Sequence, residues 1–201
     1  MSARQTSLLA MGPPSLPDDL ATLERIDLGD GAWVDHRPFW LGGADVWLDE
    51  LTTTIEWSTA SRPMYDRIVD VPRLISNFDR SNPDTPAQFE ALARVFERHY
   101  GRRFPRIGCN LYRDGADSVA WHADKVSRPG DSIVGILSVG ERRPFLLRPA
   151  AGGASRRFML GDGDLIVLGG TTQAFWQHAV PKLAHAGPRL SIMVRDESRS
   201  L

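Results

Sequence analysis

The stretch RIGCNLYRDGADSVAWHAD, residues 106–124, indicates what kind of fold this 201-residue chain adopts. It begins with a short apolar run that ends at Tyr112, which is typical of a β-strand, and continues through a turn rich in Asp and Gly. It ends with His122 and Asp124, two residues apart, whose side chains project to the same side if the segment is extended. The stretch therefore predicts strands that present polar side chains at a shared site.

Short apolar runs separated by turns continue from here to the C-terminus. We expect strands at residues 107–112, 132–139, 144–148, 157–160, 164–168 and 190–195. Several short strands at regular spacing, after two helices, are typical of a β-sandwich or barrel of jelly-roll type with helices on one face. The predicted fold class is α+β, a jelly roll supported by N-terminal helices.

The first of these helices is expected between residues 42 and 57. Its predicted apolar side consists of Val46, Trp47, Leu51 and Ile55. Acidic residues occupy the other side, which we expect to face water.

The second helix carries a stronger start signal. Thr85 is the expected N-cap, Pro86 suits the first turn, and Gln88 would complete a capping box. The apolar stripe consists of Phe89, Leu92, Ala93 and Phe96. Gly101 is the expected end of this helix.

Length and composition favour a single soluble domain over residues 23–201, preceded by a flexible Pro- and Ser-rich tail over residues 1–22. The formal net charge of −1 argues against a uniformly basic nucleic-acid protein, so any nucleic-acid surface must be local. Cys109 is the only cysteine, and the chain has no leader-like or membrane-spanning apolar run. We therefore expect a cytoplasmic protein.

A third ligand can join His122 and Asp124. His178 lies in a strand-like stretch at residues 175–180. Two His and one carboxylate occupy one face of an octahedral ion and leave the opposite positions open, as Fe(II) oxygenases require. A His-x-Asp pair with a distant His also arises by chance, and the alternative is a satisfied surface histidine. We treat His36, His99 and His185 as structural or solvated.

Two pairs of polar residues strengthen the metal hypothesis. Arg189 and Arg195 are six apart and share a face of the last strand, where each can bind a carboxylate bidentately. Asn110 and Tyr112 share a face of the strand before the His-x-Asp pair and offer an amide and a phenol. Together these four side chains could hold a dicarboxylate.

Five motifs follow one another in this order: Asn110-Leu-Tyr112, His122-Ala-Asp124-Lys125, Gly169-Gly170, His178, and Arg189 with Arg195. As an ordered set they resemble the AlkB family of oxidative nucleic-acid demethylases, over residues 106–196. The resemblance implies a double-stranded β-helix, with Fe(II) and 2-oxoglutarate as cofactors and dioxygen as cosubstrate. It also implies oxidative demethylation of N-alkylated bases in DNA such as 1-methyladenine and 3-methylcytosine, with release of formaldehyde and succinate.

The resemblance also assigns roles to individual residues. It implies that His122, Asp124 and His178 bind iron. Arg189, helped by Asn110 and Tyr112, would pair with the distal carboxylate of 2-oxoglutarate, and Arg195 would lie nearer the metal. Two alternatives stay open: a hydroxylase of the same fold acting on RNA, protein or a small molecule, and a non-enzymatic jelly-roll module that binds nucleic acid.

Substrate contacts are less well marked. Residues 57–74 resemble the nucleotide-recognition lid of the family, and the candidates for base contact are Trp57, Met64, Tyr65, Arg73 and Lys125. The aromatic and Met side chains could equally belong to the core. A local phosphate contact could come from Arg102, Arg103, Arg106, Arg142, Arg143, Arg156 and Arg157, or these could form a solvated rim. Val126 and Ser191 depart from the family pattern.

The N-terminal tail carries one further motif. Gln5, Ser7, Leu8 and Leu9 resemble the short peptide with which bacterial repair and replication proteins bind the sliding clamp. A peptide in a flexible tail can order on a groove without disturbing the domain. The partners predicted from the sequence are alkylated DNA, with RNA as an alternative, and a sliding clamp bound by the tail.

Overall fold

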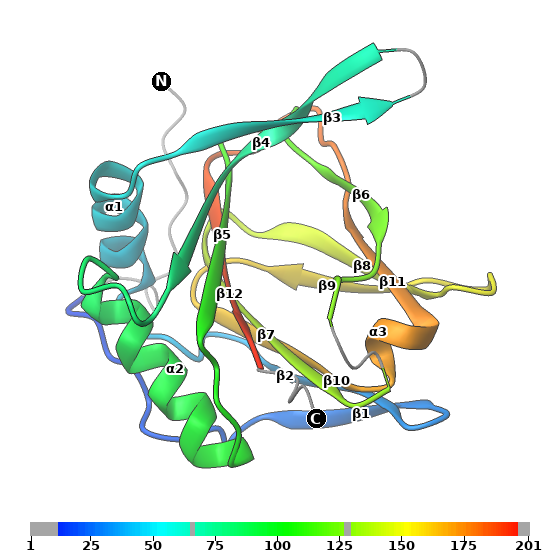
Figure 1. Ribbon diagram of the computed structural model, residues 1–201, viewed down its shortest axis with the longest axis horizontal. Helices are drawn as coiled ribbons and strands as arrows, with labels where there is room; N and C mark the ends of the chain where they lie inside the picture. The colour runs from blue at the N-terminus through cyan, green and yellow to red at the C-terminus, as the bar shows by residue number, and fades with distance from the viewer. Residues whose placement is uncertain (1–11, 65–66, 127–129, 197–201) are drawn as a thin grey trace.

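Two antiparallel sheets face each other in the computed structural model, which describes residues 12–64, 67–126 and 130–196 and, within residues 60–71, the backbone alone (Figure 1). The larger sheet has the strand order β1 (Glu24–Gly29), β2 (Ala32–Arg37), β10 (Asp164–Gly170), β7 (Ser132–Gly140), β12 (Arg189–Arg195), β5 (Arg106–Tyr112), β4 (Arg67–Asp79) and β3 (Ser58–Met64). The smaller sheet has the order β6 (Val119–His122), β11 (Trp176–Val180), β8 (Arg143–Pro149) and β9 (Arg156–Leu160).

This arrangement confirms the predicted α+β jelly-roll architecture. Each of the strands predicted downstream of residue 106 forms, with ends within two residues of those expected. The sequence did not predict β1 to β4. They extend the larger sheet at both ends, and the hairpin β3–β4 occupies the region expected to form a lid.

Helix α1 (Ala44–Thr54) covers the outer face of the larger sheet, as expected. Its buried residues are Ala44, Trp47, Leu48 and Leu51. The placement of Val46 on the apolar side was wrong, because Val46 is 41% exposed. Residue 46 falls outside the i, i+3, i+4 series that Ala44, Trp47, Leu48 and Leu51 make on one face of a helix.

Helix α2 (Ala87–Tyr100) buries the predicted stripe of Phe89, Leu92, Ala93 and Phe96. Gly101 ends it in the left-handed conformation, at φ 63°. The predicted capping box is wrong: Pro86 is the N-cap, and the helix start has no side-chain cap. The Thr85 hydroxyl instead donates to the Asp79 carbonyl, which closes the turn after β4.

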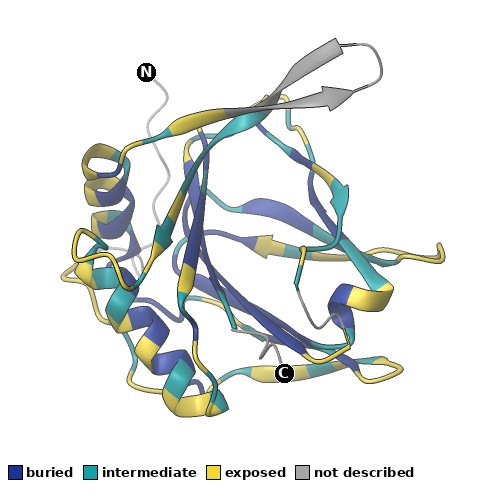
Figure 2. Ribbon diagram, in the orientation of Figure 1, coloured by how far each residue is buried: buried dark blue, intermediate teal, exposed yellow. Residues whose placement is uncertain are grey.

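The larger sheet separates two apolar clusters. One lies under α1 and α2, and the other lies between the two sheets (Figure 2). Gly135 on β7 allows α2 to approach closely, since a Cβ there would lie 2.2 Å from the Phe96 ring. All nine residues of β7 are buried, so this strand contributes to both clusters.

The folded body begins before the predicted boundary at residue 23. Leu20 is 1% exposed in the helix-side cluster, and Ser15 forms a β-bridge with Gly42. The motif of Gln5, Ser7, Leu8 and Leu9 lies outside the described residues, so the clamp hypothesis stays a prediction. None of the helices in the described ranges is both long and apolar enough to cross a membrane.

Candidate metal and cosubstrate site

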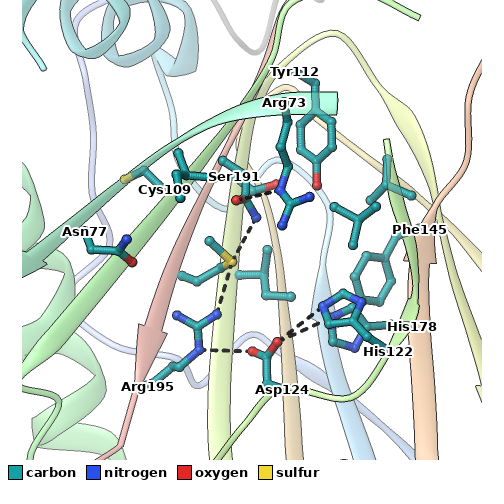
Figure 3. A pocket seen from close by; sticks show the side chains of 16 residues that line it. Arg73, Asn77, Cys109, Tyr112, His122, Asp124, Phe145, His178, Ser191 and Arg195 are labelled. Atoms are coloured by element: carbon teal, nitrogen blue, oxygen red, sulfur yellow. Dashed lines mark hydrogen bonds and ion pairs between the residues drawn. The ribbon is translucent and has the colours of Figure 1, made fainter. Parts of the chain in front are cut away.

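The three predicted metal ligands meet between the two sheets (Figure 3). His122 ends β6, and it lies directly opposite His178 on the neighbouring antiparallel strand β11. Asp124 follows two residues after His122. One ligand atom from each of the three residues lies within 4.8 Å of the others. The predicted convergence of the two imidazoles and the carboxylate is thus present in the fold.

Both imidazoles are oriented by neighbouring groups. Nδ1 of His122 lies 2.8 Å from the Ala120 carbonyl oxygen, a contact that fixes the orientation of the ring, and Nε2 faces Asp124. His178 stacks on Phe145, with ring centroids 5.2 Å apart. Burial lowers the pKa of His178 to about 4, so its imidazole is neutral at pH 7. Neutral imidazole is the form that binds a metal ion.

The carboxylate of Asp124 presents its two oxygens to different partners. Oδ1 lies 3.5 Å from Nε2 of His122 and 3.8 Å from Nε2 of His178. Oδ2 accepts a 3.0 Å hydrogen bond from Nε of Arg195. Burial acts to raise the pKa of Asp124, but the hydrogen bond with His122 and the charge of Arg195 outweigh it and hold the pKa well below its usual range. An ionised carboxylate with Oδ1 directed at two imidazoles suits a divalent cation.

A cavity of about 290 Å³ adjoins these ligands. Its lining combines the ligands with polar groups from the larger sheet, among them Arg73, Asn77, Asn110, Tyr112, Ser191 and Arg195. Apolar side chains, among them Ile136, Phe145 and Met193, complete the wall. A chamber that combines apolar side chains with convergent polar groups is typical of a site for a small molecule.

The predicted cosubstrate residues Asn110 and Tyr112 line this cavity. Tyr112 is 2% exposed, and burial raises the pKa of its phenol, which therefore keeps its proton. Asn110 accepts a 3.0 Å hydrogen bond from Nε of Arg73 and directs its amide nitrogen to the sulfur of Met193. Figure 3 shows the Arg73 guanidinium beside Tyr112, so this candidate for base contact lies next to the predicted cosubstrate residues.

Arg189 is buried beside Tyr112. The residue is 1% exposed, its Cζ lies 5.2 Å from the centre of the Tyr112 ring, and it is not among the residues that line the cavity. Nε donates to the Leu160 carbonyl and Nη2 to the Ser138 hydroxyl, whereas Nη1 is buried without a hydrogen-bond partner among the described residues. An unsatisfied buried guanidinium nitrogen next to the Tyr112 phenol fits a carboxylate ligand.

The other substrate candidates are distributed over several places. Trp57 is partly buried, packs against the helix-side core, and donates its Nε1–H to the Thr52 carbonyl, which fits the alternative of a packing role. The side chains of Met64 and Tyr65 lie outside the described residues. Lys125 is exposed and lines a groove that adjoins the cavity at Asn77, Asp124 and Arg195.

The predicted arginine cluster does not act as one surface. Arg143 is fully buried, and its guanidinium donates to the carbonyls of Asp114, Asp117 and Pro181. Arg102 pairs with Asp131 and Asp196, and Arg142 pairs with Asp164. The side chains of Arg103, Arg106, Arg156 and Arg157 are exposed.

Sequence reasoning did not select Gln173 or Asn77. Oε1 of Gln173 accepts a 2.8 Å hydrogen bond from the backbone N–H of Asp124. Asn77, on β4, lines both the cavity and the groove. Neither residue has a motif-like spacing to the metal ligands. The departures Ser191 and Val126 differ in position: Ser191 lines the cavity, and Val126 packs against the core between the sheets.

Residues 47–198 match the family model described as the 2OG-Fe(II) oxygenase superfamily. The chain belongs to this superfamily. The match includes the three predicted metal ligands and the polar residues of the cavity.

Curated relatives place the chain beside the AlkB branch of this superfamily. The chain is 30% identical over 174 residues to human "Alpha-ketoglutarate-dependent dioxygenase alkB homolog 3", covering 76% of this chain and 61% of that protein. It is 27% identical over 234 residues to "DNA oxidative demethylase ALKBH2" of Arabidopsis thaliana, covering 94% of this chain and 74% of that protein. The chain thus spans about 61% of the length of the alkB homolog 3 relative.

Solved structures share the fold. An oxidoreductase of the 2OG-Fe(II) oxygenase family from Burkholderia pseudomallei superposes with a TM-score of 0.58 at 17% identity, over 83% of this chain and 86% of that one. The structure of OsALKBH1 gives a TM-score of 0.58 at 14% identity, over 87% of this chain and the whole of that one. At these identities the likeness concerns the architecture of the two sheets.

Proposed function

We propose that this protein is an Fe(II)- and 2-oxoglutarate-dependent dioxygenase that oxidatively demethylates N-alkylated bases in DNA, such as 1-methyladenine and 3-methylcytosine. The observation that carries the proposal is the triad of His122, Asp124 and His178 at the wall of a cavity that also contains Tyr112 and Asn110. When bound, Fe(II) and 2-oxoglutarate supply the oxidising chemistry, in which dioxygen is consumed, succinate forms and an N-methyl group leaves as formaldehyde.

The residues of the chain would bind and orient the reactants. The Nε2 atoms of both histidines and Oδ1 of Asp124 would hold the metal, while Arg195 keeps Oδ2 away from it. The Tyr112 phenol would donate to a carboxylate of 2-oxoglutarate. Arg189, through the unpartnered Nη1, would supply the buried positive charge that offsets the charge of that carboxylate. The apolar side chains of Phe145 and Met193 would limit the access of water to the reacting groups.

Nucleic acid is the substrate class supported by the charges around the site. Arg106 and Lys125 line the groove of about 610 Å³ that adjoins the cavity, and both are exposed. Strands β6, β8, β9 and β11 of the smaller sheet contain no acidic residue, and two of their arginines, Arg156 and Arg157, are exposed. These cations could contact phosphates next to a flipped base. A relative named as a DNA oxidative demethylase also supports this choice.

The test is to load the protein anaerobically with Fe(II) and 2-oxoglutarate and then to add oxygen together with an oligonucleotide containing 1-methyladenine or 3-methylcytosine. Mass spectrometry should show loss of the methyl group and an equal amount of succinate. His122→Ala and Arg189→Ala should each abolish both products, whereas His99→Ala, which changes an exposed histidine that does not line the cavity, should not.

The possible outcomes separate the alternatives. Succinate without methyl loss, on DNA and RNA alike, would assign the chain to hydroxylation of a protein or small molecule. Methyl loss from RNA alone would identify RNA as the substrate in place of DNA and would leave the proposed demethylation reaction unchanged. Failure of the wild type to bind Fe(II) would overturn the proposal and favour the non-enzymatic binding module.

A further inference from the structure

Asp124 is the metal-ligand candidate that lies outside regular structure, since β6 ends at His122. Its carboxylate is fixed by Arg195 through Oδ2, as described above. Its backbone is fixed separately, because the Asp124 N–H donates to Oε1 of Gln173 at 2.8 Å. The rotation of a carboxylate about its side chain cannot compensate for a backbone that drifts, so this second contact bears directly on where Oδ1 points.

Gln173 can provide a fixed acceptor because its own segment is anchored. It lies on α3 (Thr172–Phe175), the short turn between β10 and β11. The Thr172 hydroxyl contacts the carbonyls of Gly169 and Trp33, and the Thr171 hydroxyl donates to the Asp30 carbonyl. These bonds join α3 to β10, to β2 and to the turn before β2. The same short turn leads into β11, which carries His178.

Gln173 is buried although only part of its amide group is hydrogen-bonded. The residue is 5% exposed, and its Nε2 is buried with no hydrogen-bond partner among the described residues. An unsatisfied buried amide nitrogen costs about 1–3 kcal/mol, so an apolar side chain of the same size would suit this place better for packing alone. The contact that an apolar residue could not make is the one with the Asp124 backbone.

We propose that Gln173 is a positioning residue for the metal site, which holds the Asp124 backbone so that Oδ1 faces the two imidazoles when a divalent metal binds. Gln173 acts through Asp124, and its side chain links the segment that carries His122 and Asp124 to the segment that carries His178. The inference rests on the metal site of the proposed function, but it does not depend on the identity of the oxidised substrate.

The test measures metal binding rather than turnover. Mn(II) or Co(II) is titrated anaerobically into the 201-residue chain by calorimetry, and the Co(II) absorption spectrum is recorded. Gln173→Leu removes the acceptor at nearly constant volume, and we expect its metal dissociation constant to rise about 10–100-fold, the usual effect of losing a residue that orients a ligand. The Co(II) spectrum should shift, because the coordination geometry changes. Gln173→Glu keeps an acceptor oxygen and should restore most of the affinity.

The matched control is Gln177→Leu, the same substitution four residues later. Oε1 of Gln177 accepts from Arg148 and has no hydrogen bond to the triad among those described, so metal affinity should be unchanged. The metal-induced rise in melting temperature, taken relative to each variant's own metal-free value, corrects for any loss of overall stability. Should Gln173→Leu not fold, Gln173→Met replaces it in the comparison with Gln173→Glu.

Equal dissociation constants and Co(II) spectra for wild type and the apolar variant would overturn the inference while the metal site stands. A wild-type chain that binds none of these metals would overturn the proposed function as well. A third outcome would also overturn the inference. If Gln173→Glu and Gln177→Leu weaken metal binding as much as Gln173→Leu does, the loss of affinity does not depend on the acceptor oxygen of residue 173.

Discussion

The two faces of β12 differ in polarity and in what they contact. Leu190, Ile192 and Val194 point to the helix-side cluster and are at most 1% exposed. Arg189, Ser191, Met193 and Arg195 alternate with them and point between the sheets, where three of the four line the cavity. Successive side chains of a strand project to opposite faces, so the same strand contributes to the apolar scaffold on one face and to the site on the other. The comparison teaches that scaffold and site can be disrupted separately.

The largest effect is expected from removing a ligand on the site side. His178→Ala should reduce succinate formation by more than the roughly 10–100-fold that accompanies loss of a residue that only orients a ligand. The fold should persist, because the two apolar clusters keep their residues. Coupled assays of succinate and far-ultraviolet circular dichroism would check both parts. A variant that turns over at the wild-type rate would contradict the assignment of His178.

A substitution in the helix-side cluster is expected to reduce stability and to leave the site intact. Phe96→Ala leaves a cavity where the ring packs on Gly135 of β7, and it should lower the free energy of unfolding by about 3–5 kcal/mol. Metal affinity of the protein that remains folded should not change. Urea denaturation measures the loss. Phe175→Ala is the control, since Phe175 is 53% exposed and its loss should cost no more than about 0.5 kcal/mol.

A smaller effect should follow from Arg195→Leu. Without the guanidinium, Oδ2 of Asp124 loses its 3.0 Å partner and the carboxylate can rotate. We expect metal binding to weaken about tenfold, the lower end of the effect of losing a supporting residue. Calorimetry with Mn(II) measures it. Arg106→Leu changes the residue directly opposite on β5 and should leave affinity unchanged; an equal loss in both would show that the effect comes from overall charge.

The smallest effect concerns pH and the outer scaffold. Hydrogen bonds from Arg80 and then Arg94 lower the pKa of Glu90 on α2 from 4.5 to about 2. The folded-state pKa lies below the unfolded one, so this contribution to stability is present above pH 4.5 and is lost as the pH falls toward 2. Glu90 is 35% exposed, so solvent screening limits it to about 0.5–1 kcal/mol.

Glu90→Gln tests this contribution, with the exposed Glu56→Gln as its control. The free energy of unfolding should fall less between pH 6 and pH 3 in Glu90→Gln than in the wild type, and as much as the wild type in Glu56→Gln. Identical pH profiles for the wild type and Glu90→Gln would contradict the prediction.

The features that could be predicted from the sequence are those that follow from the alternation of side chains along a strand. The strands after residue 106 and the pairing of His122 with Asp124 on one side depend on backbone period alone, so they could be predicted. The depth of a side chain depends on what the fold places around it. Arg143 is therefore buried, although sequence reasoning placed it at a phosphate contact or in a solvated rim, and Arg189 lies next to the Tyr112 ring and outside the cavity lining. Gln173 contacts Asp124 across 49 residues, which no local pattern indicates.

The buried guanidinium of Arg143 has a consequence for the order in which the molecule assembles. Its hydrogen bonds reach carbonyls 29, 26 and 38 residues away, on the loop after β5 and on the residue after β11. Contacts across such separations cannot form until β8 and both of those segments are in place, because loop closure precedes them. Arg143 thus joins three segments that meet only once β8 and β11 are in place, and its loss would leave three carbonyls without their hydrogen-bond donor.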